Sequence, residues 1–179
     1  MRTRSFLILA IIVMLWATVP ASVSDEKRIE LNAPAAPWVL SFPAANFKMA
    51  ERKIRPDGAA YFYLTDENSG LNVSMYIEPV KDCNSSKACR DMIWKAGNPN
   101  WVNPQNVVQG EIRDVSYVEF MVPEFQRQPV RQENMYAEFV VDRFWVDLHI
   151  SKVLFTPADH SLFEEFVKSI KFESKKRPV

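Results

Sequence analysis

The sequence predicts an α+β domain built on an antiparallel β-sheet of about six to seven strands, with two main helices packed on it. Three observations predict this class. Strand-like stretches follow one another at short intervals, tight turns at Pro-Asp-Gly (56–58) and Asn-Ser-Gly (68–70) separate the early ones, and only two stretches show helical spacing. Strands that are joined by tight turns pair in antiparallel orientation.

The first half of the domain carries four predicted strands. Large apolar side chains alternate in WVLSF, and one face of LNVSMYIEP is apolar, as in half-buried strands. The turn residues between the later strands supply the backbone conformations that hairpins need. The predicted strands are residues 38–42, 51–55, 59–65 and 71–79.

A first helix is predicted between Ser85 and Ala96. Ser85 or Ser86 can cap it, because a serine hydroxyl accepts a hydrogen bond from a free amide of the first turn. Gly97 then ends it. Its apolar stripe consists of Ala88, Cys89, Met92, Ile93 and Ala96.

The second half begins with VVQGEIRDVSYVEFMVP, which reads as two strands around Arg113-Asp114 or as one bent strand. PEFQRQPVRQEN is then expected to be a long polar loop. Residues 135–142 and 144–154 are predicted to form a hairpin through Asp142-Arg143.

The closing helix has the clearest start signal. Thr156, Pro157 and Asp159 form a capping signature with proline at the first helical position. An apolar stripe follows, and a short strand can begin at Lys171-Phe172. The stripe consists of Leu162, Phe163, Phe166, Val167 and Ile170.

The amino terminus, residues 1–21, has the order of a secretory signal peptide. Arg2 and Arg4 precede an apolar run, and small residues follow, with cleavage expected between Ala21 and Ser24. An uncleaved membrane anchor is the alternative, although the run is shorter than the ~20 residues of a spanning helix. We therefore expect a secreted or periplasmic protein without a stable membrane span after cleavage.

Three further segments complete the predicted organisation. Residues 22–37 are expected to be an exposed lead-in, with a short edge strand through Ile29 and Leu31 as the alternative. Residues 38–173 form the single globular domain. Residues 174–179 are expected to be a disordered tail, because they offer nothing to bury.

Composition excludes several functional classes. The chain has 22 basic and 22 acidic residues, interleaved without a basic block, which argues against nucleic acid as a partner. Its four glycines are too scattered for a phosphate-binding loop. We expect no cofactor and no bound metal.

The order of elements resembles a known fold group. A strand-rich start (WVLSFPAANF), a helix after the fourth strand, a WVDLHIS strand and a closing helix ending in FVKSIKF together resemble the fold that the PsbP and Mog proteins share. The resemblance covers roughly residues 37 to 173. It implies a largely non-enzymatic, accessory role, and it carries no functional residue over to this chain.

Cys83 and Cys89 are the two cysteines of the chain. In an oxidising compartment an even count favours a disulfide, which would tie the preceding loop to the first turn of the helix. The alternatives are free or redox-active thiols and a metal site. Five intervening residues do not match the spacing of zinc-binding cysteine pairs.

A polar strand face is the candidate for acid–base chemistry. Trp145, Asp147 and His149 project together from one strand, and Tyr136 and Glu138 share that face if the hairpin register allows it. The alternative is a polar face that is solvated or covered by a helix. A small hydrolase that uses His149 and Asp147 is therefore one candidate function.

Aromatic residues in proline-containing loops are the candidate partner-binding surface. Trp101 and Phe125 supply apolar area, and Arg127 and Arg131 supply a polar rim. Alternatively, both rings are buried in the domain. The function we favour is a secreted or periplasmic, non-enzymatic binding or accessory module whose partner is another envelope or secreted protein, and an envelope structural role is the third candidate.

Overall fold

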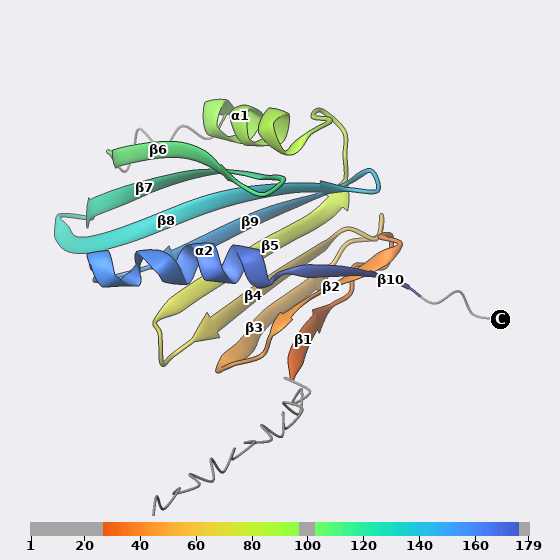
Figure 1. Ribbon diagram of the computed structural model, residues 1–179, viewed down its shortest axis with the longest axis horizontal. Helices are drawn as coiled ribbons and strands as arrows, with labels where there is room; N and C mark the ends of the chain where they lie inside the picture. The colour runs from red at the N-terminus through yellow and green to blue at the C-terminus, as the bar shows by residue number, and fades with distance from the viewer. Residues whose placement is uncertain (1–26, 97–102, 176–179) are drawn as a thin grey trace, which may run out of the picture.

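The computed structural model describes residues 27–96 and 103–175 (Figure 1). The predicted signal peptide 1–21 and the predicted binding residue Trp101 lie outside these ranges. Within them the chain forms a seven-stranded sheet, a three-stranded sheet and two α-helices. This arrangement confirms the predicted α+β class, and the three-stranded sheet is an addition that the sequence did not predict.

The large sheet is antiparallel throughout, with the strand order β3-β4-β5-β9-β8-β7-β6. Tight turns join most neighbours along the chain, including β4 to β5 and β8 to β9. Its strands are β3 (Phe47–Ile54), β4 (Ala60–Asp66), β5 (Leu71–Pro79), β6 (Gln105–Ile112), β7 (Val115–Phe125), β8 (Gln128–Val141) and β9 (Phe144–Lys152).

The segment 123–134 differs from its expected form. It is a continuation of β7 and β8 with a tight turn at Gln126-Arg127, in place of a long loop. Both turn residues have positive φ, at 50° and 67°, as a two-residue hairpin turn of this hand requires. Neither is Gly, Asn or Asp, so the usual sequence signal for the turn is missing.

The small sheet brings the two ends of the domain together. β2 (Trp38–Pro43) pairs with β1 (Arg28–Leu31) on one edge and with β10 (Lys171–Ser174) on the other. The expectation of an exposed lead-in is therefore wrong for the described residues 27–37: they contain the alternative, an edge strand through Ile29 and Leu31. Leu31 is fully buried, and the burial of this apolar side chain stabilises the strand against the core.

The boundaries of the domain shift accordingly. Ordered structure begins before residue 38, because Ala33 and Ala36 are buried as well. At the other end, Ser174 belongs to β10, and Lys175 donates a hydrogen bond from Nζ to the Ala33 carbonyl at 2.8 Å. Residues 176–179 of the expected tail lie outside the described residues.

The two helices pack on opposite faces of the large sheet. α2 (His160–Ser169) follows a short 3-10 turn at Pro157–Asp159 and lies against the main core, where Phe163 is fully buried. α1 (Ser86–Ala96) contacts β7 and β8 on the other face (Figure 1). Neither helix is long and apolar enough to span a membrane within the described part of the chain.

Candidate functional site

The structure gathers the polar side chains that the sequence singled out on β8 and β9. Tyr136 lies directly opposite His149, and Glu138 lies opposite Asp147. Trp145 occupies the same face, since it precedes Asp147 by two residues in β9. We call these five residues the polar cluster. It lies on the face of the sheet that α1 partly covers.

His149 is held by neighbours other than Asp147. Its ring stacks on that of Tyr136 with centroids 4.3 Å apart, and its Nε2 lies 3.1 Å from Oδ1 of Asn134. Burial lowers the pKa of His149 to about 4, so the ring is neutral at neutral pH. In the tautomer that fits this contact, Nε2–H donates to Asn134, and this bond occupies the proton-carrying nitrogen.

Glu138 is the most deeply buried acid of the cluster, with no exposed surface. Its Oε2 accepts a hydrogen bond from the Trp145 indole at 2.5 Å. Burial, and then the nearby Asp147, raises the pKa of Glu138 to about 9, against the opposing effect of the Trp145 bond. Glu138 is therefore protonated at neutral pH.

Asp147 has a smaller shift of the same sign. Burial, and then the charge of Glu78, raises its pKa to about 6. Among the described residues, neither Oδ1 of Asp147 nor Oε1 of Glu138 has a hydrogen-bond partner, although both atoms are buried. Two neighbouring buried carboxyl groups of this kind carry a free-energy cost that the surrounding fold must offset.

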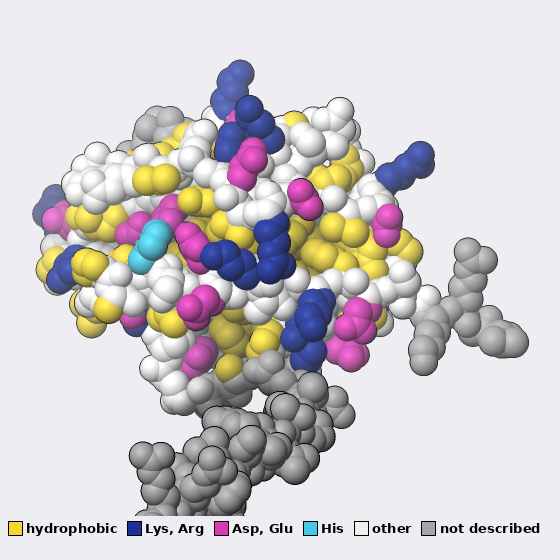
Figure 2. Space-filling view, viewed as in Figure 1, with side chains coloured by type: hydrophobic (Ala, Val, Ile, Leu, Met, Phe, Trp, Pro, Cys, Tyr) yellow, Lys and Arg dark blue, Asp and Glu magenta, His cyan; other side chains and the backbone are white. Residues whose placement is uncertain are grey.

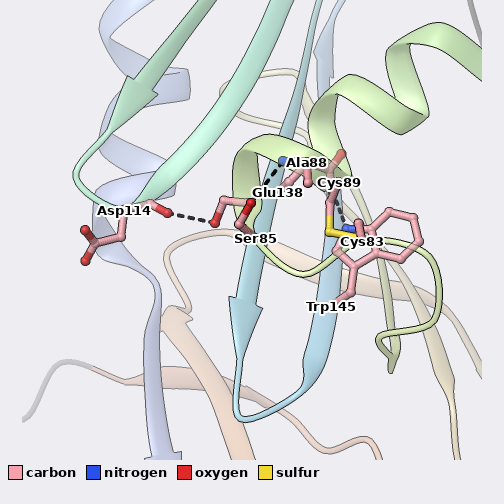
Figure 3. Close-up of a disulfide and its surroundings, with 8 residues drawn as sticks. Cys83, Ser85, Ala88, Cys89, Asp114, Glu138 and Trp145 are labelled. Atoms are coloured by element: carbon pink, nitrogen blue, oxygen red, sulfur yellow. Dashed lines mark hydrogen bonds between the residues drawn. A yellow bond between two sulfur atoms is a disulfide. The ribbon is translucent and has the colours of Figure 1, made fainter.

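A disulfide lies beside the polar cluster. Cys83 and Cys89 are joined, with their Cα atoms 5.0 Å apart, and Figure 3 shows Trp145 and Glu138 next to the pair. Ser85 caps α1 by accepting a hydrogen bond from the Ala88 amide at 3.2 Å. The first turn of α1 is thus fixed both covalently and by a cap above the buried acids.

The polar cluster has the residue types of acid–base chemistry, but most of its members form hydrogen bonds or ring contacts with one another or with the adjacent Asn134. His149 bonds to Asn134, Trp145 bonds to Glu138, and Tyr136 stacks on His149. No group of three or more His, Cys, Asp or Glu side chains within residues 27–96 and 103–175 is placed to hold a metal ion. The arrangement is that of a polar layer between the sheet and α1.

Three of the four predicted partner-binding residues, all except Trp101, which is outside the described residues, lie around one end of the large sheet. Phe125 ends β7 and is 45% exposed, and Arg127 occupies the turn that follows. Arg131 belongs to β8, where its guanidinium donates to the Phe155 carbonyl at 3.2 Å. The structure therefore brings Phe125, Arg127 and Arg131 to the same hairpin.

Sequence reasoning missed two residues at this end. Val153 and Leu154 follow β9 directly and are 48% and 70% exposed. The Leu154 amide donates to the Val130 carbonyl at 3.1 Å, which places this segment beside β8. No local signal marks these two residues, because VL at 153–154 reads as the end of an alternating strand.

A second acid pair lies on the opposite face of the sheet, near the start of α2. Glu119 and Glu133 are both buried, and His160 Nδ1 lies 3.2 Å from Oε1 of Glu119. Burial, and then Glu119, raises the pKa of Glu133 to about 7. Figure 2 shows a histidine beside acidic side chains at the surface here. Sequence reasoning missed this group because its members come from three separate elements.

Comparison with known proteins adds one result. No protein-family model and no curated protein matches the sequence. A solved structure does match the fold: the solution structure of cyanobacterial PsbP (CyanoP) from Synechocystis sp. PCC 6803, with a TM-score of 0.53 and 11% sequence identity over 87% of this chain and 98% of that chain. The Mog part of the expected resemblance stays a prediction. At this identity the likeness concerns the fold, and we conclude that the chain has a PsbP-like fold.

Proposed function

We propose that this protein is an extracytoplasmic, non-enzymatic binding or accessory module that recognises another protein through one end of its large sheet. The PsbP-like fold supports an accessory role. The disulfide supports an oxidising compartment, and the order of residues 1–21 supports export by a cleaved signal peptide. We define the hairpin-end surface by Phe125, Arg127, Arg131, Val153 and Leu154.

The observation that carries this proposal is the conformation of Leu154. Its φ is +55°, a left-handed conformation that a bulky side chain adopts only at a cost. Its side chain is 70% exposed, so burial within the domain does not offset that cost. The Leu154 amide bonds to Val130, but the exposed side chain gains little from the fold of the isolated chain, and contact with a partner would bury it.

The neighbours of Leu154 have the chemistry of a protein interface. Phe125 and Val153 add exposed apolar area, at 45% and 48% exposure. Arg127 and Arg131 are exposed at the same hairpin, and arginine and aromatic residues are enriched among side chains that contribute most to binding. Trp101 is not part of this surface as we define it.

The hydrolase alternative, with His149 and Asp147 as its acid–base pair, has less support. His149 lies beside Asn134 and stacks on Tyr136, and the low pKa of its ring weakens it as a base at neutral pH. An envelope structural role is a third possibility, for which the same surface would serve as a permanent contact.

Two variants test the proposal. A photo-crosslinking residue at position 154, introduced in cells that produce the protein, should give a discrete protein adduct, and the same residue at position 54 should not. Ile54 is a matched control, because it is an apolar side chain at 42% exposure on the edge strand β3. The adduct is then identified by mass spectrometry.

Leu154→Asn separates binding from folding. Asparagine tolerates positive φ well, so the melting temperature should stay the same or rise, and affinity for the crosslinked partner should fall by about tenfold or more. A variant that melts earlier and binds as tightly as the native protein would show that Leu154 serves the fold.

A further inference from the structure

The core of the domain opens to solvent beside the end of α2. A cavity of about 300 Å³ lies between the end of α2, β10, the end of β8 and the β6–β7 turn. We propose that this cavity binds the apolar chain of a small anionic amphiphile, with its acidic head group at Arg113. The inference is independent of the hairpin-end surface. The residues that line the cavity are mostly apolar, and the six used here are Arg113, Val115, Phe139, Val140, Val141 and Lys168.

The walls of the cavity belong to the main core. Val115 and Phe139 retain 8% and 6% of their surface exposed, while many core side chains on the same sheet, such as Leu148, are fully buried. Val140 and Val141 are half-buried at the rim. Figure 2 shows hydrophobic side chains gathered over β10 and the end of the β8–β9 hairpin, with basic side chains next to them. An apolar chain in the cavity would remove this surface from water.

The mouth of the cavity carries a positive group in a fixed position. Arg113 lies in the β6–β7 turn, and its Nη1 donates to the Lys168 carbonyl at the end of α2, 3.5 Å away. On the other side, Asp114, the next residue of the turn and an acidic member of the cavity lining, accepts a hydrogen bond at its backbone carbonyl from the Ser86 hydroxyl of α1, 2.8 Å away. The turn is therefore held by both helices, so that the guanidinium is positioned at the mouth.

Arg113 has further guanidinium N–H groups that can donate to an anion. A guanidinium has five N–H donors, and a carboxylate or phosphate fits two of them at once. Lys168 adds a second positive charge at the rim, although its Nζ pairs with Glu164 on the same helix at 2.5 Å. The cavity size is at the lower limit of roughly 300–1,000 Å³ for ligand pockets, so it fits one short chain.

Titration calorimetry with octanoate, below its micelle concentration, tests the proposal on the purified chain. We expect saturable binding, about tenfold weaker binding of octanol, and a similar loss in Arg113→Asn. Arg143→Asn is the matched control, because Arg143 is also an exposed arginine with positive φ in a hairpin turn and is not among the residues that line the cavity. Its affinity for octanoate should equal that of the native protein.

A cavity-filling variant locates the chain of the ligand. Val141→Phe should abolish octanoate binding while the protein keeps its melting transition, and Val115→Phe, at another core residue of the lining, replaces it if that variant does not fold. The proposal would be overturned if octanol bound as tightly as octanoate. It would also be overturned if both cavity-filling variants still bound octanoate. Binding to vesicles of anionic phospholipid in the absence of any octanoate binding would overturn it too, and would identify a membrane surface as the source of the anion.

Discussion

α1 and α2 cover opposite faces of the same sheet but contact very different surfaces. α2 adds Phe163, Phe166 and Val167 to a large core that includes both sheets. α1 lies over a small cluster built on Val118, Phe120 and Val122, with Trp94 packed against it. Buried carboxyl groups from β8 and β9 share that face.

The difference shows how a helix is retained where apolar burial is scarce. Burial of apolar surface contributes roughly 25 cal/mol per Å². The buried apolar side chains of α2 therefore stabilise its packing on the sheet without further links. α1 has less of this contribution, and it has a disulfide, a serine cap and a hydrogen bond from Ser86 to the β6–β7 turn in addition. Stability around α1 should therefore respond to redox state, and stability around α2 should not.

The largest expected effect separates the two helices by core truncation. Phe163→Ala removes a fully buried ring of α2 and should lower the free energy of unfolding by about 3–5 kcal/mol. Trp94→Ala removes a half-buried ring of α1 and should cost clearly less, because its site is already partly open to solvent. Urea unfolding of both variants measures the difference, and equal costs would break the comparison.

Removal of the disulfide should have an intermediate effect. The Cys83→Ser, Cys89→Ser double variant loses a short covalent loop, which is worth about 2 kcal/mol by the chain-entropy relation. Hydrogen exchange should show faster exchange in α1 and little change in α2.

In the native protein, a maleimide should label the cysteines only after reduction. Labelling before reduction would contradict the bridge.

The smallest expected effect is a dependence on pH that the polar cluster imposes. Burial raises the pKa of Glu138 from 4.5 to about 9 in the folded protein, so between these values the unfolded chain binds fewer protons than the folded one. Stability should therefore be highest near pH 4.5 for this group and fall as the pH rises toward 9. His149 acts in the opposite sense, because burial lowers its pKa from 6.5 to about 4 and stability is lost as the pH falls through that range.

Glu138→Gln tests the alkaline side. It should raise the free energy of unfolding at pH 8 and change it little at pH 4.5, because the amide stays neutral throughout. Glu165→Gln, an exposed position on α2, is the control and should shift both values equally. If the free energy of unfolding depends on pH in the same way in both variants, Glu138 is not protonated in the folded protein.

Local signals in the sequence predicted much of the fold. The turns at 56–58 and 142–143, the serine cap of α1 and the capping signature at Thr156 all correspond to observed element ends. The turn at Gln126-Arg127 was missed because its residues are not those that favour positive φ. The sheet of β1, β2 and β10 was missed because β10 pairs with β2 over a long separation in the chain, which no local pattern reveals.

The site was predictable only in part. Strand alternation placed Trp145, Asp147 and His149 on one face, and the hairpin register then brought Tyr136 and Glu138 opposite them. The sequence did not indicate that Asn134 would be the partner of His149. Nor did it place Leu154 outside the strand, because a left-handed leucine has no sequence signal.

The position of β2 sets the order in which this chain can fold. Its two edges are filled by a strand that precedes it closely and by β10, which is made of the last residues that the structure describes. Arg28 reinforces the closure by donating from Nη2 to the Ser169 carbonyl, 2.9 Å away and 141 residues later in the chain. A chain that emerges from a ribosome or a membrane pore amino end first leaves β2 with one open edge until residue 174 is free. The small sheet is thus completed only after β10 has been synthesised or transported, and removal of β10 would expose an edge of β2, a strand made much earlier in the chain.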